Sequence, residues 1–542
     1  MFGQCLQQPL RPQYGGGIIV NPELDDGLKG WSTFGNAKLV TRVSTEGNNN
    51  YIVAFQRNQP HDSFSQQIIL EKEKLYTLSA WVQVSHGNAD ITAMIKTASG
   101  SYRLAGVVVA RANCWSMLKG GIGVNSSGPA ELYFESKNSS VDIFADSISI
   151  QPFTQQEWKS HQDYSVEKFR KTKVRLQAID NQGKPLPNTT ISIKQQGGGF
   201  PLGVAINKNI LTNKAYEDWF ASRFKFTTFE NEMKWSSTEP SQGNENYGDP
   251  DAMLELTRRH NVAVRGHNVF WEDPNYQSWW LKSLSPPQLS AATLKRINSL
   301  VRRYSGKVIH WDVDNENLHS SFFTSKLGKE VSARFFKVVN YIDRHGIPFL
   351  NEFNTIETPS DQAVAPPKYL DKINELRGQG YTGPLGIGLQ GHFEVPNLAY
   401  MRSGIDQLAS TKLPIWITEL DVKSNQNQAV VLEQVMREAH AHPAIGGIIV
   451  WSAWRPEGCY RMCLTDNNFR NLPTGDVVDK LLKEFGASVV QGTTNDDGYF
   501  EVNLFHGDYH VEINHPMSTN STIKKFKVVP QGEFQATFQV TL

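Results

Sequence analysis

Between residues 199 and 486, short apolar runs alternate with longer stretches in which apolar residues recur every three or four positions. Such short runs predict strands covered on both faces, and the longer period predicts amphipathic helices, for example residues 289–304 and 428–442. Eight runs predict strands: 200–206, 225–230, 262–267, 308–313, 348–353, 385–392, 414–420 and 446–451. Eight strand and helix repeats predict a (β/α)8 TIM barrel over residues 199–486. A doubly wound open sheet is the alternative, but no GxGxxG follows the first strand.

Residues 17–153 follow a different pattern, in which polar and apolar residues alternate over short runs separated by Gly, Asn and Ser. YTLSAWVQV (76–84), LYFES (132–136) and VDIFADSISI (141–150) are examples. Alternation with period two predicts half-buried strands, so this region is expected to be an all-β sandwich of the jelly-roll kind. Residues 1–16 form an extension before it, and residues 154–172 are interpreted as a linker.

The barrel is flanked by two further segments of strand-like pattern, residues 173–198 and 487–542. Neither segment alone can bury two faces of a sheet. We expect them to pair in space as one small β-sandwich with the barrel inserted between its parts. Two separate edge extensions remain the alternative.

Length, charge and hydropathy limit the classes of molecule that this chain is expected to bind. At 542 residues the chain is long enough for two or three domains, and its formal net charge of +0 provides no basic field for nucleic acid or anionic lipid. No apolar run approaches the roughly 20 residues that cross a bilayer, so no membrane partner is expected. An uncharged partner fits best, and we expect a monomer.

The cellular compartment of the protein and the redox state of its cysteines are indicated by fewer residues. MFGQCLQQPL lacks the basic start and apolar core of a signal peptide, whereas acceptor sequons at Asn125, Asn138, Asn188 and Asn520 favour a secreted glycoprotein. Cys459 and Cys463 are close enough for a local disulfide, although two thiols fit the spacing equally. By spacing, Cys5 and Cys114 are predicted to be unpaired. No His/Cys cluster suggests zinc, and no cofactor is predicted.

Polar side chains follow nearly every predicted barrel strand. In a (β/α)8 barrel, chemistry is located at the carboxyl ends of the strands, so these residues predict one site at a common rim. The candidates are Glu230, Asn231, Lys234, His267, Trp271, Asn315, Glu316, Gln390, His392, Glu419, Asp421 and Trp451.

Two glutamates are distinctive because each closes an apolar strand: Glu316 and Glu419. Their strands, the fourth and seventh, are expected to face each other across the barrel mouth. Two opposed carboxyl groups, one protonated and one ionised, supply what cleavage of a glycosidic bond requires. Paired carboxylates can also bind magnesium, but the surrounding amides, indoles and imidazoles suit sugar hydroxyls and ring faces better.

The motifs in their order resemble glycoside hydrolase family 10, the endo-1,4-β-xylanases. The resemblance rests on FENEMKW (229–235), RGHNVFW (265–271), WDVDNENLH (311–319), GLQGHF (388–393), ITELD (417–421) and VWSAW (450–454). GHNVFWEDP and the segment from GCYRMC to KLLKEF are similar to the plant branch of that family. NPELDDGLKGW (21–31) and the ending of residues 132–153 resemble a family 22 carbohydrate-binding module, and the flanking segments resemble the carboxypeptidase regulatory-like fold.

The family resemblance implies a retaining mechanism with Glu316 as general acid/base and Glu419 as nucleophile, about 5 Å apart. It implies that Asn315 binds the sugar 2-hydroxyl, that His392 holds the nucleophile, and that Asp421 orients His392. The remaining implied contacts are to the sugar on the non-reducing side: Glu230, Asn231, Lys234, His267, Trp271, Gln390 and Trp451.

The sequence departs from the family pattern at three places. Glu272 follows Trp271 where many members have His, and Asp314 replaces a usually apolar or small residue. Strand alternation predicts that Asp314 points away from Glu316, toward the helices. The RMCLTDNNF loop after the eighth strand is also unlike the bacterial form.

Within the sandwich, alternation places Trp81 on the polar face of its strand and exposes Tyr133 and Glu135, with Tyr102 as a weaker candidate. Exposed aromatic side chains suit a polysaccharide, although they can instead cover a contact between domains.

The sequence therefore predicts an extracellular endo-1,4-β-xylanase that acts on xylan of the plant cell wall. Two alternatives remain: a xylan endotransglycosylase with the same two glutamates, and a non-catalytic xylan-binding protein.

Overall fold

The computed structural model describes residues 5–44, 49–486, 489–518, 521–530 and 532–541. The chain forms two compact units. The first comprises Met1–Lys159, Asn231–Tyr247 and Arg265–Leu420, and the second comprises Ser160–Glu230, Gly248–Val264 and Asp421–Leu542. The predicted domain boundaries do not coincide with these units, because both units contain barrel strands.

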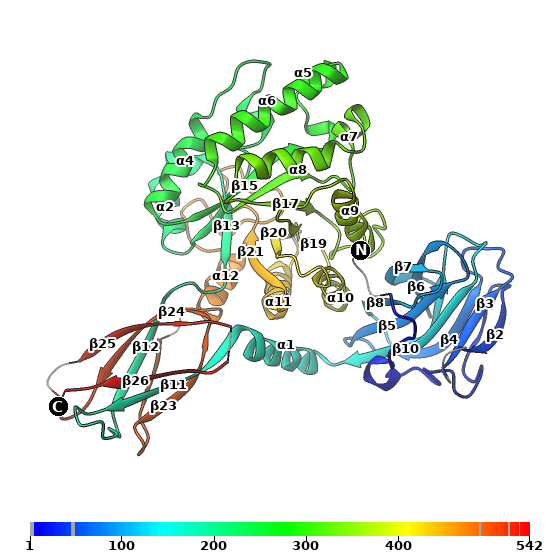
Figure 1. Cartoon of the computed structure of the whole chain (residues 1–542), viewed down its shortest axis with the longest axis horizontal. Coiled ribbons are helices and arrows are strands. Elements are labelled where there is room, and N and C mark those ends of the chain that lie inside the picture. Colours follow the sequence, from blue (N-terminus) through cyan, green and yellow to red (C-terminus); the bar gives the residue numbers. More distant parts are fainter. Residues whose placement is uncertain (1–4, 45–48, 487–488, 519–520, 531, 542) are drawn as a thin grey trace. The chain divides into compact units, whose positions relative to one another are not determined.

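The N-terminal region is one antiparallel sheet of ten strands in the order β1-β4-β9-β6-β7-β8-β5-β10-β3-β2 (Figure 1). The strands are β1 (Ser32–Phe34), β2 (Lys38–Val43), β3 (Asn50–Phe55), β4 (Ser63–Leu70), β5 (Leu75–Val84), β6 (Asn88–Thr97), β7 (Tyr102–Arg111), β8 (Ser116–Gly123), β9 (Gly128–Glu135) and β10 (Ile143–Phe153). Because β1 and β4 at one end contact β2 and β3 at the other, the sheet folds over into a sandwich. The predicted β-sandwich is confirmed.

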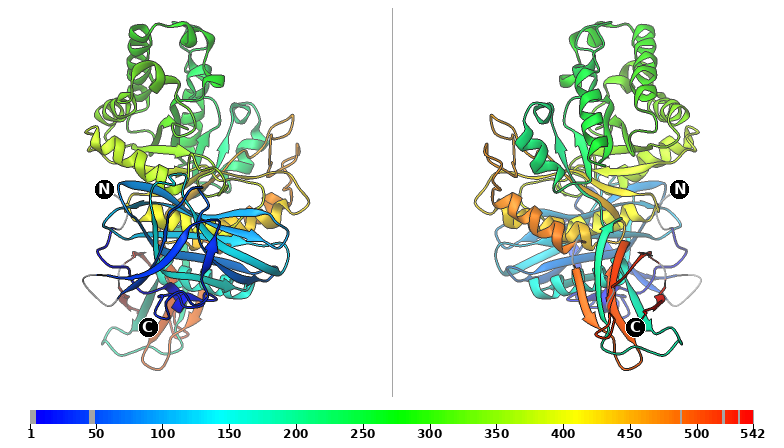
Figure 2. Two further views of the ribbon diagram at one scale, coloured as in Figure 1. Left: turned by 90° about the vertical axis from the view of Figure 1, so that its right-hand side faces the viewer. Right: turned by 90° about the vertical axis from the view of Figure 1, so that its left-hand side faces the viewer.

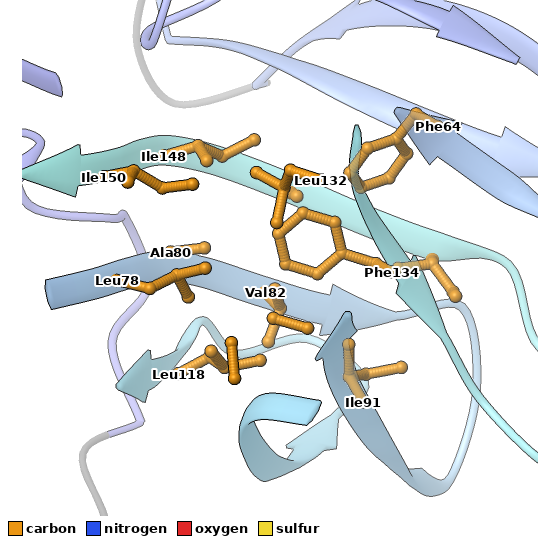
Figure 3. Packing of buried hydrophobic residues seen from close by; sticks show 14 of the residues in the cluster. Phe64, Leu78, Ala80, Val82, Ile91, Leu118, Leu132, Phe134, Ile148 and Ile150 are labelled. Carbon is orange, nitrogen blue, oxygen red and sulfur yellow. The ribbon is translucent and has the colours of Figure 1, made fainter. Parts of the chain in front are cut away.

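The core of this sandwich follows from the alternation in the sequence. On β5, Leu78, Ala80 and Val82 point inward and pack with Leu132 and Phe134 of β9 (Figure 3). The residues between them point to the opposite face. Every second position is therefore apolar because only one face of each strand meets the core.

The central sheet has the strand order β18-β17-β16-β15-β14-β13-β21-β20-β19, and β18 also pairs with β20, which closes eight strands into a ring. The strands are β13 (Leu202–Ile206), β14 (Phe226–Phe229), β15 (Ala263–Trp271), β16 (His310–Asn315), β17 (Ile347–Glu352), β18 (Gly386–Leu389), β19 (His392–Phe393), β20 (Ile415–Val422) and β21 (Ile445–Val450). Their residues are almost all buried, as expected for strands covered on both faces. The (β/α)8 barrel is confirmed.

The helices are η1 (Gln13–Gly16), α1 (Gln155–Arg170), η2 (Lys208–Leu211), α2 (Lys214–Ala221), α3 (Trp235–Thr238), α4 (Gly248–Arg259), η3 (Pro274–Tyr276), α5 (Trp279–Ser283), α6 (Pro286–Tyr304), α7 (Phe322–Leu327), α8 (Val331–Ile342), α9 (Pro366–Gly378), α10 (Leu398–Ala409), α11 (Gln428–Ala441) and α12 (Pro473–Glu484). Those from η2 onward alternate with the barrel strands, whereas η1 and α1 precede the barrel. The two helices predicted from period correspond to α6 and α11. A Ser285–Gln288 capping box and Pro286 fix the start of α6.

The two segments that flank the barrel pair with each other, as their pattern predicted. Their strands are β11 (Lys171–Ile179), β12 (Thr190–Gly197), β22 (Val489–Thr493), β23 (Tyr499–Phe505), β24 (Gly507–Asn514), β25 (Thr522–Val528) and β26 (Phe534–Gln539). They form two sheets, β23-β11-β26 and β22-β12-β24-β25, around a shared apolar core. Figure 2 shows these strands, distant in sequence, side by side.

Most of residues 154–172, interpreted as a linker from the sequence, form helix α1. One expectation was wrong: Cys5 and Cys114 are not unpaired but form a disulfide, and a second disulfide joins Cys459 and Cys463. Leu6 pairs with Trp115 in an isolated bridge, which brings the first cysteine beside the β7–β8 turn despite a separation of 109 residues.

In the first unit, β5 and β8 of the sandwich pack against α10. Lys119 of β8 forms an ion pair with Asp406 of α10 at 3.0 Å, and Asn397 donates to the carbonyl of Gly121 at 2.9 Å. A Cβ at Gly121 would lie 2.5 Å from Ala399, so the close approach requires glycine.

Three predicted sequon asparagines, Asn125, Asn138 and Asn188, are exposed, and Asn520 lies outside the described residues. None of the helices within the described ranges combines the length and apolar character needed to cross a membrane.

Candidate active site

Glu316 immediately follows β16, at the carboxyl end of the fourth barrel strand, and its backbone is left-handed at φ 59°. Two side chains, one at the end of β15 and one directly after β18, hold its carboxyl group. The indole N–H of Trp271 donates to Oε2 at 2.6 Å, and the amide of Gln390 donates to Oε1 at 3.0 Å. Burial raises the pKa of Glu316, and the charge of Glu419 raises it further. The Glu316 carboxyl is thus poised to carry a proton.

Glu419 lies in β20 and is nearly buried. His392 Nε2 is 3.6 Å from Oε2 of this carboxylate, and His267 Nδ1 is 3.9 Å from Oε1. Burial raises the pKa of Glu419, but the positive charge of His267 and the hydrogen bond from His392 outweigh it and lower that pKa to about 2. The Glu419 carboxyl is therefore ionised over the whole physiological range.

Asn351, at the end of β17, connects Asn315 with Glu419. It is not among the residues predicted from the sequence. Its Nδ2 donates to Oε1 of Glu419 at 2.9 Å and to Oδ1 of Asn315 at 2.8 Å. Thr418 donates to its Oδ1 at 2.5 Å, which fixes the orientation of the amide. The signal that identified the other candidates, polar residues at a strand end, is present in the Asn-Glu pair at 351–352.

The remaining candidates of the first unit gather around this pair of carboxyl groups. Lys234 donates to Asn231 at 3.0 Å, lies over the ring of Trp271 at 4.7 Å, and adds to the positive charge that lowers the pKa of Glu419. Trp271 also stacks on Tyr276 with ring centroids 4.0 Å apart. Nδ1 of His267 donates to Oδ2 of Asp312 at 2.9 Å, which fixes the imidazole beside the nucleophile candidate.

Three candidates, Glu230, Asp421 and Trp451, lie in the second unit. Glu230 follows β14, is fully buried, and accepts from Arg455. Asp421, near the end of β20, accepts from Arg461 at 2.7 Å. Neither arginine was among the residues predicted from sequence.

The turn that follows Glu316 is anchored to buried carboxyl groups. Asn317 donates to Asp314, and the backbone N–H of Leu318 donates to Glu352. His319 lies between Glu352 at 2.7 Å and Asp361 at 2.9 Å. Each residue of the turn after the acid/base candidate is thus tied to a carboxylate.

His319 and Glu352 have shifted pKa values. Burial lowers the pKa of His319, but the hydrogen bonds and charges of Glu352 and Asp361 outweigh it and raise that pKa to about 9. Burial raises the pKa of Glu352 to about 7 despite its hydrogen bond from His319.

In the N-terminal sandwich, two predictions of exposure were wrong. Trp81 is fully buried, although it lies on the face of β5 opposite the sandwich core. Tyr133 points away from the core, as alternation predicted, but Phe34 stacks on it at 3.9 Å and leaves it only 2% exposed.

Tyr102 remains a surface residue at 55% exposure, and its ring meets that of Tyr133 edge to face. Lys96 lies within 6 Å of both the Phe34 and Tyr102 rings, at 5.9 and 5.8 Å. Glu135 is half-buried, and burial raises the pKa of its carboxyl. The outer face of β1, β6, β7 and β9 thus carries an aromatic cluster, defined as Phe34, Tyr102 and Tyr133.

Comparison with known proteins bears on both regions. A family model described as glycosyl hydrolase family 10 matches residues 191–474. The chain belongs to glycosyl hydrolase family 10.

A second model, described as a carbohydrate binding domain, matches residues 16–140. Endo-1,4-beta-xylanase 5 of Arabidopsis thaliana is 40% identical over 485 residues, which cover 86% of this chain and 85% of that protein. Endo-1,4-beta-xylanase 3 of the same plant is 31% identical over 571 residues, covering 98% and 74%. A crystal structure of xylanase 10B from Thermotoga petrophila RKU-1 is similar with a TM-score of 0.47 at 23% identity, covering 53% of this chain and 94% of that one.

Two departures from the family 10 pattern are neighbours in the structure. Glu272 accepts from the backbone N–H of Phe323 at 2.6 Å and from the hydroxyl of Thr324 at 2.9 Å, so it caps the start of α7. Asp314 is buried toward the helices, where its carboxyl group accepts from Asn317 and Ser332. Burial, reinforced by the charge of Asp314, raises the pKa of Glu272 to about 8.

Proposed function

We propose that this family 10 enzyme hydrolyses internal 1,4-β-xylosidic bonds of plant cell-wall xylan with retention of anomeric configuration. The observation that carries the proposal is a pair of buried carboxyl groups, one directly after β16 and one in β20, whose pKa values are shifted in opposite directions. Burial raises the pKa of Glu316, whereas the neighbouring imidazoles lower the pKa of Glu419 to about 2. A pair in which one group is protonated and the other ionised meets the chemical demand of glycoside cleavage.

In the first step, the Glu419 carboxylate attacks the anomeric carbon and forms a glycosyl ester, while Glu316 gives its proton to the departing glycosidic oxygen. Formation of the ester removes the negative charge of Glu419, so the pKa of Glu316 falls. In the second step, the Glu316 carboxylate takes a proton from water, which attacks the same carbon and releases Glu419. This direct attack calls for carboxyl groups about 5 Å apart.

The neighbouring side chains support these steps in the proposal. The amide of Asn315 binds the sugar 2-hydroxyl, with Asn351 fixing that amide from behind. His392 holds the nucleophile, and Asp421 orients His392. Glu230, Asn231, Lys234, His267, Gln390 and the indoles of Trp271 and Trp451 line the subsites on the non-reducing side.

The N-terminal sandwich is proposed to bind xylan through the face that carries Tyr102 and Glu135, on which Tyr133 is covered by Phe34. An aromatic side chain with more than half its surface exposed matches the apolar face of a pyranose ring. We propose that the enzyme acts in the extracellular space, consistent with the exposed sequon asparagines and the plant relatives.

The test is time-resolved product sizing from xylan, glucuronoxylan, arabinoxylan and carboxymethylcellulose, with Glu316→Gln and Glu419→Gln as controls. We expect early products of intermediate length from xylan, and loss of activity by several orders of magnitude in both variants while xylan binding persists. Full activity in either variant would refute the assignment. Products longer than the substrate would favour transglycosylation, and absence of turnover would favour a binding protein.

A further inference from the structure

We infer that Arg455 and Arg461, both in the loop after β21, position Glu230 and Asp421, so that one loop sets both substrate affinity and turnover. The inference deepens the proposed function and rests on the roles proposed there for these two carboxylates. Neither arginine is among the residues to which the family resemblance assigns a role.

The two contacts come from the same short segment. Arg455 donates through Nε to Oε2 of Glu230 at 3.0 Å and through a terminal nitrogen to the same oxygen. Arg461 donates through Nε to Oδ1 of Asp421 at 2.7 Å. The two carboxylates stand at the ends of β14 and β20, whereas only five residues lie between the two arginines.

Both carboxylates are buried, so each depends on its arginine to stay ionised and in place. Glu230 is fully buried and Asp421 is 3% exposed, whereas Arg455 and Arg461 are one-third and one-fifth exposed. A buried carboxylate that loses its charged partner either takes up a proton or moves toward water. An ionised carboxylate accepts from sugar hydroxyls, whereas a protonated one has one acceptor oxygen fewer.

The loop is built to hold its arginines in place. The Cys459–Cys463 disulfide closes a ring around Arg461. The carbonyl of Arg461 accepts from Gln428 at 3.0 Å, and the carbonyl of Cys463 accepts from Thr474 at 2.6 Å.

The other end of the loop is anchored through Trp454. Its carbonyl accepts from Asn207 at 2.8 Å, and its indole N–H donates to Asn467 at 2.8 Å. Asn207 also reaches Oε1 of Glu230 at 3.4 Å, so the carboxylate and the residue next to Arg455 share one amide.

The disulfide itself points to a local role. A cross-link stabilises a fold mainly by restricting the unfolded chain, and this effect grows with the length of the loop that it closes. A bond between residues 4 apart therefore restricts little of the unfolded chain, in contrast to Cys5–Cys114 at a separation of 109. What the short ring does restrict is the placement of Arg461.

The two arginines are expected to have separable kinetic effects. Because Glu230 is proposed to bind a sugar away from the reacting carbon, Arg455→Met should raise KM for xylohexaose about tenfold with kcat within about twofold. Because Asp421 is proposed to act through His392 on the nucleophile, Arg461→Met should lower kcat about tenfold with KM nearly unchanged. Lysine at either position should restore part of the loss, since it keeps the charge but not the fork of donors.

Arg223 provides a matched control in the same unit. It forms a two-point ion pair with Asp479 at 2.9 and 3.2 Å, and it is one-quarter exposed. Arg223→Met removes a comparable ion pair and should leave both kinetic constants unchanged. A second comparison uses the two disulfides. The double variant Cys459→Ala/Cys463→Ala should impair turnover at a nearly constant melting temperature. The double variant Cys5→Ala/Cys114→Ala should lower the melting temperature alone.

The experiment is steady-state kinetics on xylohexaose with the full chain, with melting temperatures measured for every variant. A change in KM for Arg455→Met and a change in kcat for Arg461→Met would support the inference. Arginine variants that behave like Arg223→Met, or that lose activity only in proportion to a lost melting temperature, would overturn it. Full activity of Glu316→Gln in the same assay would instead refute the proposed function, so the two failures are distinct.

Discussion

Nδ2 of Asn351 lies 2.9 Å from Oε1 of Glu419 and donates a hydrogen bond to it. The nucleophile candidate is thus held by a neutral donor as well as by imidazoles, and the same amide holds Asn315. This geometry makes Asn351 a positioning residue that connects three barrel strands.

Asn351→Ala removes both hydrogen bonds from the site. A hydrogen bond to a charged group contributes about 1.5–3 kcal/mol, so kcat on xylohexaose should fall roughly ten- to hundredfold. Asn298, which is half-buried on α6 and donates to the carbonyl of Leu294, supplies a control for loss of an asparagine. Wild-type kcat in Asn351→Ala would show that the amide does not position the nucleophile.

The pKa of Glu316 should respond to the charge of Glu419. In Glu419→Gln the neighbouring negative charge is gone, so Glu316 should release its proton at lower pH. The fall should be partial, because burial is the larger cause of the raised pKa. Carbon NMR titration of labelled glutamate carboxyls measures this shift directly. An unchanged or higher pKa would contradict the assignment of acid and nucleophile.

The same shifts predict the pH profile of the wild-type enzyme. Activity requires protonated Glu316 and ionised Glu419, so kcat/KM should fall as pH rises through the raised pKa of Glu316. On the acid side, ionisation of Glu419 persists until pH approaches about 2. A profile with its alkaline limb at the ordinary pKa of a glutamate would contradict this prediction.

His319 should make stability depend on pH. Its pKa is raised to about 9 in the fold, so its contribution is fully present below about pH 6.5 and is lost as pH rises toward 9. The pKa of Glu352, raised to about 7, acts in the same direction at lower pH, where its contribution is lost as pH rises toward 7. The melting temperature of the wild type should therefore decline between pH 6.5 and 9, which corresponds to a loss of unfolding free energy on the order of 2 kcal/mol. In His319→Gln the decline should be smaller, and an equal decline would rule out this cluster as its source.

Glu272 should act as a neutral cap near pH 6. Because its pKa is raised to about 8, Glu272→Gln imitates the protonated form and should change the melting temperature little at pH 6. Glu272→Ala removes the acceptor for Phe323 and Thr324 and should cost about 1–2 kcal/mol. Thermal unfolding of both variants at pH 6 tests the cap, and equal losses in the two would contradict it.

The sandwich offers a contrast between two aromatic residues. Tyr102→Ala should weaken xylan binding by the full chain about tenfold, since stacking on a sugar is worth about 1–1.5 kcal/mol. Trp81→Phe should leave binding unchanged, because Trp81 is fully buried. Affinity electrophoresis in xylan gels, run in the Glu316→Gln background, compares them. Loss of binding in Trp81→Phe alone would reverse this assignment.

The barrel was predictable from sequence because its strands are covered on both faces and therefore form continuous apolar runs. The glutamates were predictable for the same reason: a carboxyl group at the end of such a run conflicts with burial unless it has a role. The identical signal, polar residues at the end of an apolar strand, is present at Asn351 and Glu352.

Other features depend on tertiary contacts that no local pattern contains. Alternation correctly gave the face on which Trp81 and Tyr133 lie, but not that α10 packs against β5 or that Phe34 covers Tyr133. The Cys5–Cys114 disulfide depends on a bridge between Leu6 and Trp115, far apart in sequence. Helix α1 is mostly polar, so it carries little of the apolar period that identified α6 and α11.

Trapping of the covalent intermediate tests the central claim most directly. A 2-fluoro-xylobioside with a good leaving group slows hydrolysis of the glycosyl ester, so the enzyme should gain one glycosyl mass, and peptide mapping should place it on Glu419. No adduct should form in Glu419→Gln. An adduct on a different carboxylate, or absence of any adduct together with first products of inverted anomeric configuration, would contradict the account.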